Sequence, residues 1–325
     1  MKSLLQSGQW AEFRKTQGWE AHNILDIQIL QKKLFLGKSF LYAPEVTWKN
    51  LDTKFEKIYE NTKKIAKNDQ SIFFRLEILD EFDEKIVEKL KENGFTKAFE
   101  EVQPEYRHII DISKGEQEIL SQMKEKGRYN IRVAQKHGIV IEKSENINEF
   151  YKIFTQTAKR DGFEIRHRQY FIKMMQILEP LGFAELLFAK KDDKVLAAEI
   201  VTYYDGVASY LYGASSNEDR NLMAPYLLHW ETIRRAKKRG CKLYDLLAVD
   251  PLESKLEIRY EKLGKSTPHI SNPSYHISTL HKYAGIGKFK RQFGGKTIRL
   301  VGSWDLIFSP FWYKMFKIAE KLRRN

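Results

Sequence analysis

Residues 184–245 constrain the fold most, because strand-like and helix-like patterns follow one another there with little intervening chain. The runs AELLFAK and VLAAEIVTYY are joined by the polar turn 191–193. Asp205-Gly206 then turns the chain into VASYLYGAS, since a tight hairpin needs positive backbone angles that glycine tolerates. Large apolar and aromatic residues next recur at helical spacing, namely Leu222, Tyr226, Trp230 and Ile233. The strand-like run KLYDLLAV follows, so we predict three antiparallel strands, a helix and a returning strand.

This order of elements predicts an α/β fold with a mixed sheet, because the step from helix to strand is a natural right-handed crossover. It is the core order of the GNAT acyltransferase fold. In such sheets ligands bind where neighbouring strands part, so we expect the chemistry at the ends of these strands. The N-terminal part repeats the order, with strand-like runs, a charged amphipathic helix over 52–67 and the strand SIFFRLEIL. We therefore expect two tandem GNAT-like domains.

The composition fits a globular protein of two ordinary domains, with 325 residues, 42% hydrophobic and 30% charged. Cys241 is the only cysteine, which excludes an intramolecular disulfide and fits a reducing cytoplasm. The first residues lack the apolar core of a signal peptide, and no window reaches the roughly twenty apolar residues of a spanning helix. The net charge of +13 favours an anionic partner such as RNA, a nucleotide-linked substrate or a lipid surface; the alternative is a merely soluble basic protein.

The sequence gives no support for a bound metal or a serine nucleophile. The eight histidines show no metalloprotease spacing, and no cysteine pair exists to hold zinc. Neither a Walker loop nor a Gly-x-Ser-x-Gly elbow is present. A basic helix is predicted over 116–137, and its charges form either a solvated face or a phosphate contact. The run GIGKFKRQFGG is a weak indication of a phosphate cradle.

The C-terminal stretch IFSPFWYKMFKIAEKLRRN is aromatic, amphipathic and basic. Four of its apolar residues are expected to pack against the first domain, namely Trp312, Met315, Phe316 and Ile318. The alternative is peripheral contact of this stretch with an anionic membrane surface.

Motifs along nearly the whole chain resemble the Fem family of aminoacyltransferases, which build peptidoglycan interpeptide bridges from aminoacyl-tRNA. The N-terminal motifs are LQSGQWAEF, Tyr42-Ala43-Pro44, and Gln103-Pro104 followed by HIIDIS. The motifs GRYNIRVAQKHGIVI, FYKIFTQTAKRDGF, YGAS, APY, YDL and FKRQFGG come after them. Their order and spacing together carry the resemblance, since no single one is decisive.

The resemblance implies two GNAT-like domains, with the C-terminal segment returning to the first. We place domain one at 1–138 plus 298–325 and domain two at 139–297. Family members that act on lipid-linked precursor often insert a helical-hairpin arm in domain two, whereas here residues 222–240 pass straight into KLYDL. The chain is thus similar to armless members, which take the soluble UDP-linked muropeptide. Aminoacyl-tRNA is the implied co-substrate, with no cofactor, in a cytoplasmic monomer that could also work at the inner face of the membrane.

The FKRQFGG motif supplies the implied catalytic residue. The reaction is attack by a stem-peptide amine on the ester carbonyl of aminoacyl-tRNA, and a fixed cation near the resulting oxyanion lowers the barrier. Lys290 matches the family lysine with that role. Phe289 is placed to stack on the terminal adenine of the tRNA, and Arg291 is assigned to donor tRNA binding.

The resemblance assigns acceptor binding to several further residues. Arg166 matches an arginine that grips the acceptor phosphates, Tyr170 is its neighbour, and Glu77 falls at an acidic position near the acceptor, where we expect it to position the amine. Tyr212 and Tyr226 line the site or, alternatively, are buried by packing. A family lysine that binds phosphate is Glu12 here, so Arg14 is assigned instead. Asp245 is taken as structural, and Glu45-Val46 replaces the family's Gly-Pro, which also bears on acceptor identity.

Two other classes of function compete with this assignment. A CoA-dependent GNAT enzyme needs a glycine-rich loop whose amides bind pyrophosphate before the central helix, whereas residues 217–224 are acidic and lack glycine. A non-catalytic RNA-binding protein would depend on charge alone and would bind RNA in a salt-sensitive way.

Overall fold

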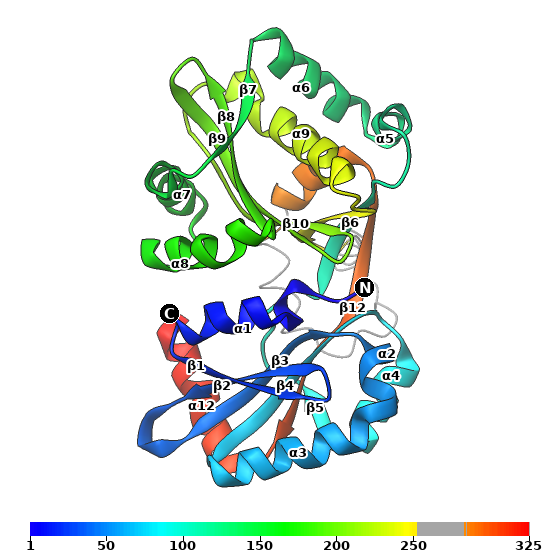
Figure 1. The fold of residues 1–325 in the computed structure, drawn as a ribbon, viewed down its shortest axis with the longest axis vertical. Helices are drawn as coiled ribbons and strands as arrows, with labels where there is room; N and C mark the ends of the chain where they lie inside the picture. The colour runs from blue at the N-terminus through cyan, green and yellow to red at the C-terminus, as the bar shows by residue number, and fades with distance from the viewer. Residues whose placement is uncertain (252–282, 284, 325) are drawn as a thin grey trace, which may run out of the picture. The chain divides into compact units, whose positions relative to one another are not determined.

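The structure is a computed structural model that describes residues 1–251, 283 and 285–324. The chain divides into two compact units. Unit 1 comprises Met1–Glu105, Gln176–Leu178 and Leu300–Asn325, and unit 2 comprises Tyr106–Met175 and Glu179–Arg299. Figure 1 shows the course of the chain through both units.

Unit 1 is a twisted sheet covered by helices. In chain order its elements are η1 (Leu4–Gln6), α1 (Gly8–Lys15), β1 (Trp19–Ile24), β2 (Ile27–Lys33), η2 (Phe35–Gly37), β3 (Ser39–Val46), α2 (Trp48–Leu51), η3 (Asp52–Lys54), α3 (Phe55–Asn68), β4 (Ser71–Glu81), α4 (Glu84–Glu92) and β5 (Phe95–Lys97). The later part of β12 (Lys296–Ile307) and the helix α12 (Pro310–Arg324) complete it. The sheet order is β1-β2-β3-β4-β12, and β5 also pairs with β12.

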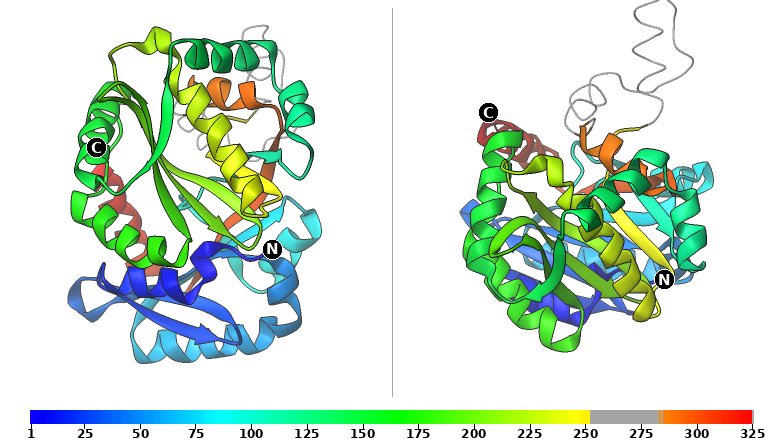
Figure 2. Two further views of the ribbon diagram at one scale, coloured as in Figure 1. Left: turned by 45° about the horizontal axis from the view of Figure 1, so that its top comes forward. Right: turned by 90° about the horizontal axis from the view of Figure 1, so that it is seen from above.

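Unit 2 contains the larger share of the strands. Its elements are β6 (Tyr106–Asp111), α5 (Glu116–Gln122), α6 (Glu125–Lys136), β7 (Val140–Ser144), α7 (Ile147–Asp161), α8 (Arg168–Leu178), η4 (Glu179–Leu181), β8 (Ala184–Lys191), β9 (Lys194–Tyr204), β10 (Val207–Ser215), η5 (Arg220–Leu222), α9 (Ala224–Lys238), β11 (Leu243–Ala248) and η6 (Arg291–Phe293). The sheet order is β12-β6-β11-β10-β9-β8-β7. Figure 2 shows α9 across one face of this sheet and α7 and α8 on the other.

The two units repeat one topology. In unit 1, β1, β2 and β3 pair antiparallel, α3 crosses over, and β4 returns parallel to β3. In unit 2, β8, β9 and β10 pair antiparallel, α9 crosses over, and β11 returns parallel to β10. The predicted α/β class with two tandem GNAT-like halves is therefore confirmed. At the position expected for the family arm, α9 ends at Lys238 and β11 begins at Leu243.

Several sequence-based expectations need correction. Residues 116–137 do not form one helix, because the chain is extended at Met123 and Lys124, where the Lys124 amide donates to the Gln292 carbonyl at 3.0 Å. The strand β12 has no counterpart among the predicted elements, although it begins directly after the glycines of the predicted phosphate cradle. The helix α8 likewise has no counterpart among the predicted elements.

The division of the chain differs from the expected one over residues 106–138. These residues belong to unit 2, because β6 pairs with β11 and the apolar face of α6, including Ile131 and Ala134, packs in one cluster with Leu227 and Leu228 of α9. The sequence offers no signal for this change, since a strand's partner is not encoded in its own periodicity.

The C-terminal helix α12 packs on unit 1 with only part of the predicted face. Trp312 and Phe316 lie against a cluster that contains Phe73 and Tyr313, as expected. Met315 and Ile318 are each 45% exposed, so the expectation that they pack inward was wrong. At about 100° per residue, Met315 lies about 60° and Ile318 about 120° around the helix from Trp312, both in the direction away from Phe316.

Candidate active site

The candidate site lies where β10 and β11 separate. The two parallel strands pair only from Val207 to Ser209 and from Leu243 to Asp245. Beyond these pairs each strand has a register shift, and Leu247 takes a left-handed backbone conformation with φ of 56°. The equivalent strands of unit 1, β3 and β4, have two register shifts but are paired at both ends of β3, from Ser39 to Val46. Only the pair in unit 2 therefore opens into a fork, the position at which ligands bind in parallel sheets.

The ammonium group of Lys290 lies in this fork. The Val249 amide donates to β6, at the carbonyl of Tyr106. Since a trans peptide is planar, the carbonyl of Ala248 in the same peptide group points the other way, toward β10. Lys290 Nζ donates to this carbonyl at 2.7 Å and lies 5.5 Å from the ring centroid of Tyr210. The side chain of Lys290 is thus held at the edge of β11 that faces β10, and Lys290 is 3% exposed.

Burial lowers the pKa of Lys290 from 10.5 to about 7, and the nearby carboxylate of Asp245 counteracts this shift only in part. The carboxylate of Asp245 accepts hydrogen bonds from Arg107 at 3.0 Å and from the Leu247 amide at 2.7 Å. These bonds hold the bend in β11, which agrees with the structural role expected for Asp245. Protonation of this buried amine is unfavourable. A new negative charge beside it would favour the protonated form and raise its pKa.

The backbone of the FKRQFGG motif fixes where Lys290 can lie. Residues 285–290 are helical and η6 follows. Gly294 and Gly295 then take φ of 78° and 81°. A Cβ on Gly295 would lie 2.3 Å from the carbonyl oxygen of Ile109 in β6, so glycine is required both for the backbone conformation and for the close approach.

Replacement of Gly295 by alanine is expected to destabilise the fold by about 2–4 kcal/mol, from left-handed strain and a backbone clash together. Gly138→Ala is a matched control, because Gly138 has φ of 71° but nothing within 4 Å of its Cβ position. It should cost only about 1 kcal/mol. Chemical denaturation of both variants measures the difference. Equal losses would show that the contact with Ile109 has no importance.

A buried polar cluster lies next to Lys290 on the α9 side. His229 Nδ1 lies 2.8 Å from the hydroxyl of Tyr244 and 3.3 Å from Glu199 Oε2, and Thr232 donates to the other oxygen of Glu199. Burial raises the pKa of Glu199 to about 8 and lowers the pKa of His229 to about 3. We therefore take both groups as uncharged near pH 7, so their 3.3 Å contact is not an ion pair.

Glu199 and His229 are not among the site residues predicted from the sequence. The signal was present, since each is a polar residue inside an apolar pattern: Glu199 interrupts VLAAEIV and His229 interrupts YLLHW. The Tyr210 ring stacks edge-on against His229 at 4.6 Å and lies over Gly213, where an added Cβ would fall within 1.6 Å of the Tyr210 hydroxyl. Gly213 of the YGAS motif thus leaves room for the ring that faces Lys290.

The register shift in β10 directs two tyrosines to opposite faces of the sheet. Tyr210 pairs with Val201 and packs in the cluster covered by α9. Tyr212 pairs with Ile200, and its ring contacts Phe154 of α7 and Phe171 of α8. In a regular strand, two residues separated by one position point to the same face. The extra residue of the bulge in β10 changes this for Tyr210 and Tyr212. The sheet therefore separates the surroundings of Tyr212 from those of Tyr210.

The predicted site residues of unit 2 fall into two groups on these faces. Arg166, Tyr170 and Tyr212 form one group: the exposed Arg166 guanidinium lies 5.8 Å from the Tyr170 ring, and the two tyrosine hydroxyls are 3.1 Å apart. Tyr226 and Phe289 form the other, with ring centroids 5.0 Å apart, on the side of α9. Tyr170 is 8% exposed, so most of its side chain is buried by packing.

Arg291 is engaged within the protein. Its guanidinium pairs with Asp250 Oδ1 at 2.8 Å and also donates to the Asp250 carbonyl. Gly287 permits this, since a Cβ there would lie 1.9 Å from the same carboxylate oxygen. This ion pair links the motif to the chain just after β11.

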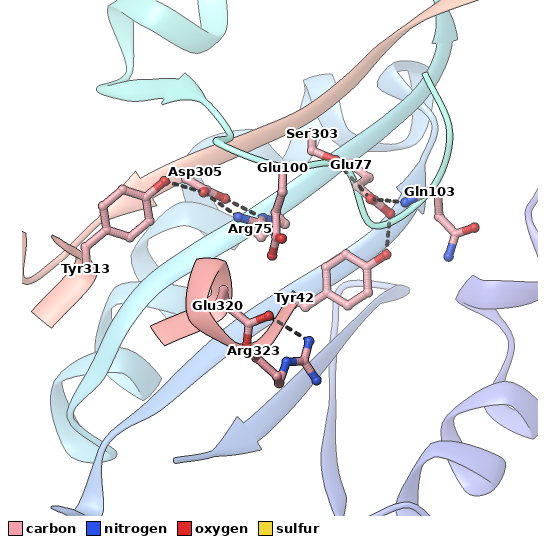
Figure 3. A network of polar contacts seen from close by, with 10 residues as sticks. All are labelled: Tyr42, Arg75, Glu77, Glu100, Gln103, Ser303, Asp305, Tyr313, Glu320 and Arg323. Carbon is pink, nitrogen blue, oxygen red and sulfur yellow. Dashed lines mark hydrogen bonds and ion pairs between the residues drawn. The ribbon is translucent and has the colours of Figure 1, made fainter. Parts of the chain in front are cut away.

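Glu77 and Arg14 belong to unit 1. Glu77 is 3% exposed and accepts hydrogen bonds from the Tyr42 hydroxyl, the Gln103 amide and the Ser303 hydroxyl, the last two at 2.9 Å (Figure 3). Burial is the main cause that raises its pKa. Arg14 stacks on Trp19, with its guanidinium carbon 4.4 Å from the ring centroid. These two residues therefore belong to a different unit from Lys290.

No group of three or more His, Cys, Asp or Glu side chains that could hold a metal ion occurs in residues 1–251, 283 and 285–324. Within the same part of the chain, no helix has the length and apolar character needed to cross a membrane.

Comparison with known proteins decides the family. The model of the FemAB family matches residues 77–180 and 176–321, which is more than half of the chain. The chain belongs to the FemAB family.

Curated relatives of this FemAB protein carry the name lipid II:glycine glycyltransferase. The protein from Staphylococcus haemolyticus is 23% identical over 401 aligned positions, which cover 97% of this chain and 90% of the relative. One from Staphylococcus aureus is 22% identical over 428 positions, covering 99% and 95%. The predicted class, an aminoacyltransferase of the Fem family, is confirmed.

Solved structures support the fold of the FemAB chain. The crystal structure of FemX superimposes with a TM-score of 0.77 at 21% identity, covering 96% of this chain and 94% of that one. The C-terminal domain of a lysylphosphatidylglycerol synthetase from Agrobacterium fabrum matches with a TM-score of 0.56 at 10% identity, covering 92% and 87%. At these identities the likeness concerns the fold alone.

Proposed function

We propose that this FemAB protein transfers an amino acid from aminoacyl-tRNA to a stem-peptide amine of a peptidoglycan precursor. The observation that carries the proposal is the buried ammonium of Lys290 in the only open fork of the described sheets. Membership of the FemAB family and relatives named for glycyl transfer to lipid II support the reaction class.

The chemistry requires one cation at the carbonyl. The acceptor nitrogen attacks the ester carbonyl of the donor, a C–N bond forms, and the carbonyl oxygen takes up negative charge. Lys290 stabilises that charge from a site with little water, where a fixed cation is most effective. On collapse the C–O ester bond breaks, and the proton lost by the amine goes to the departing ribose oxygen. The proton can thus pass from the acceptor amine to the ribose oxygen of the donor without a protein side chain.

The remaining predicted residues take binding roles in this proposal. Phe289 is half-buried against Tyr226, so its remaining ring surface is offered to a stacked base. Arg166 is exposed beside Tyr170, and its guanidinium suits the pyrophosphate of the acceptor. UDP-linked and lipid-linked muropeptides share that pyrophosphate, so Arg166 serves either acceptor. Glu77 is already held by three donors and acts, in this proposal, on positioning alone.

The test is incubation of the purified protein with mixed charged tRNAs and UDP-muropentapeptide in one arm and lipid II in the other. Mass spectrometry should find a gain of one amino acid residue on the acceptor in at least one arm. Arg166→Ala should raise KM for the acceptor by about ten-fold or more with a smaller effect on kcat, because it removes ground-state binding. No gain in either arm, or transfer from acetyl-CoA instead, would overturn the proposal.

A further inference from the structure

The most exposed apolar side chains of the described chain gather on one part of unit 1. Phe35 and Leu36, at the tip between β2 and β3, are 91% and 77% exposed. Leu322 and Phe311 of α12 follow at 71% and 67%. These four exceed all other large apolar residues among those described. Clusters of this kind on a soluble domain mark an interaction surface.

The exposed residues of α12 form a continuous stripe. Phe311, Met315, Ile318 and Leu322 are spaced by four, three and four residues, so they follow one line along the helix. The opposite side is anchored to unit 1, where Tyr313 contacts Phe73 and Phe99. The helix is therefore fixed in place with its apolar stripe turned outward.

A row of lysines runs beside the stripe. Lys314, Lys317 and Lys321 are all exposed and, at about 100° per residue, lie on one flank of it. The acidic Glu320 lies on the side of the helix away from the stripe and pairs with Arg323 at 2.7 Å. An apolar stripe bordered by lysines matches a surface with anionic head groups above an apolar layer.

The tip between β2 and β3 belongs to the same surface. Leu34 and Phe40, on either side of it, pack in one cluster with Trp312 and Phe316 of α12. Lys38 lies 5.5 Å from the Trp312 ring. Figure 1 shows the tip beside α12. Leu36 at this tip has φ of 57°, a conformation that costs energy for a leucine.

We propose that the stripe of α12 and the Phe35-Leu36 tip dock unit 1 on an anionic phospholipid bilayer. The apolar side chains enter the head-group boundary, and Lys314, Lys317 and Lys321 contact the lipid phosphates. This inference deepens the proposed function, since it would bring the enzyme to a precursor held in a membrane. It stands on residues distinct from those assigned to the transfer reaction.

The experiment is flotation of the purified full chain with phosphatidylcholine vesicles that contain or lack phosphatidylglycerol, at low and high salt. We expect binding only to the anionic vesicles, weakened by salt. Leu322→Ser and Phe35→Ser should each lower partition by about ten-fold. The triple variant of Lys314, Lys317 and Lys321 to Glu should lower it by about 100-fold or more, at about five-fold for each lysine lost.

Matched controls separate docking from general charge and from folding. Leu181→Ser removes an apolar residue that is 53% exposed in unit 2, and the variant of Lys57, Lys64 and Lys67 to Glu changes three exposed lysines of α3. Both should bind like the parent protein. Transfer to the soluble UDP-linked acceptor should be unchanged in the Leu322→Ser and Phe35→Ser variants, so loss of docking and failure of the proposed reaction are distinguishable.

Two results would overturn the inference. Equal binding to vesicles with and without phosphatidylglycerol would remove the role of charge. A dimer in solution that Leu322→Ser dissociates would assign the stripe to a second copy of the chain.

Discussion

Lys290→Met is expected to lower kcat by about 10²–10³-fold, the usual effect of removing one group that stabilises an oxyanion. Methionine is unbranched and similar in volume to lysine, but it cannot donate to the Ala248 carbonyl or carry charge. Single-turnover assays with the aminoacyl donor measure the effect. Lys288→Met is the control, since Lys288 is exposed two residues earlier in the same helical segment and should leave turnover unchanged. Undiminished transfer by the Lys290 variant would remove the proposed mechanism.

The same variant is expected to be more stable than the parent protein near neutral pH. The pKa of Lys290 falls from 10.5 to about 7 on folding, so between these values the unfolded state binds more protons than the folded state. Stability from this group therefore rises with pH across that window, and the penalty is fully present below about pH 7. Replacing the buried lysine should add about 1–3 kcal/mol at pH 7 and little at pH 10. Denaturation at both pH values measures the change.

The pKa of Lys290 also predicts how activity responds to pH. The oxyanion role needs the ammonium, whose fraction in the free enzyme falls as pH rises through about 7. The contribution of Lys290 to kcat/KM should therefore decline above that pH, while the attacking amine becomes more reactive. The ratio of parent to Lys290→Met rates isolates the first effect. A ratio that does not fall toward alkaline pH would contradict it.

Asp305→Ala is expected to lower the free energy of unfolding of unit 1 by about 3–5 kcal/mol, because it leaves a buried arginine without its main partner. Arg75, on β4, is 3% exposed and donates two hydrogen bonds of 2.8 Å to Asp305, on β12, which is fully buried. Tyr313 of α12 donates to the same carboxylate at 2.6 Å (Figure 3). This network thus joins two strands and the C-terminal helix.

Tryptophan fluorescence during denaturation is a suitable readout, since five of the six tryptophans lie in unit 1. Tyr313→Phe removes one hydrogen bond and should cost only about 1 kcal/mol. The double variant Arg75→Met with Asp305→Leu should recover most of the loss, because no buried charge then remains. A loss below about 1 kcal/mol for Asp305→Ala would mean that water already solvates Arg75.

The sequence by itself determined the repeated order of strands and crossover helix in both units, because periods of two and of about 3.6 residues are local properties of the chain. It also pointed to the family through FKRQFGG and the other motifs. Only the tertiary structure decided that residues 106–138 belong to unit 2, that Lys290 is buried beside Ala248, and that Tyr210 and Tyr212 face opposite sides. These features depend on which strands pair and where a register shifts. Lys290 and Ala248 are 42 residues apart in sequence, and no local pattern records that they meet.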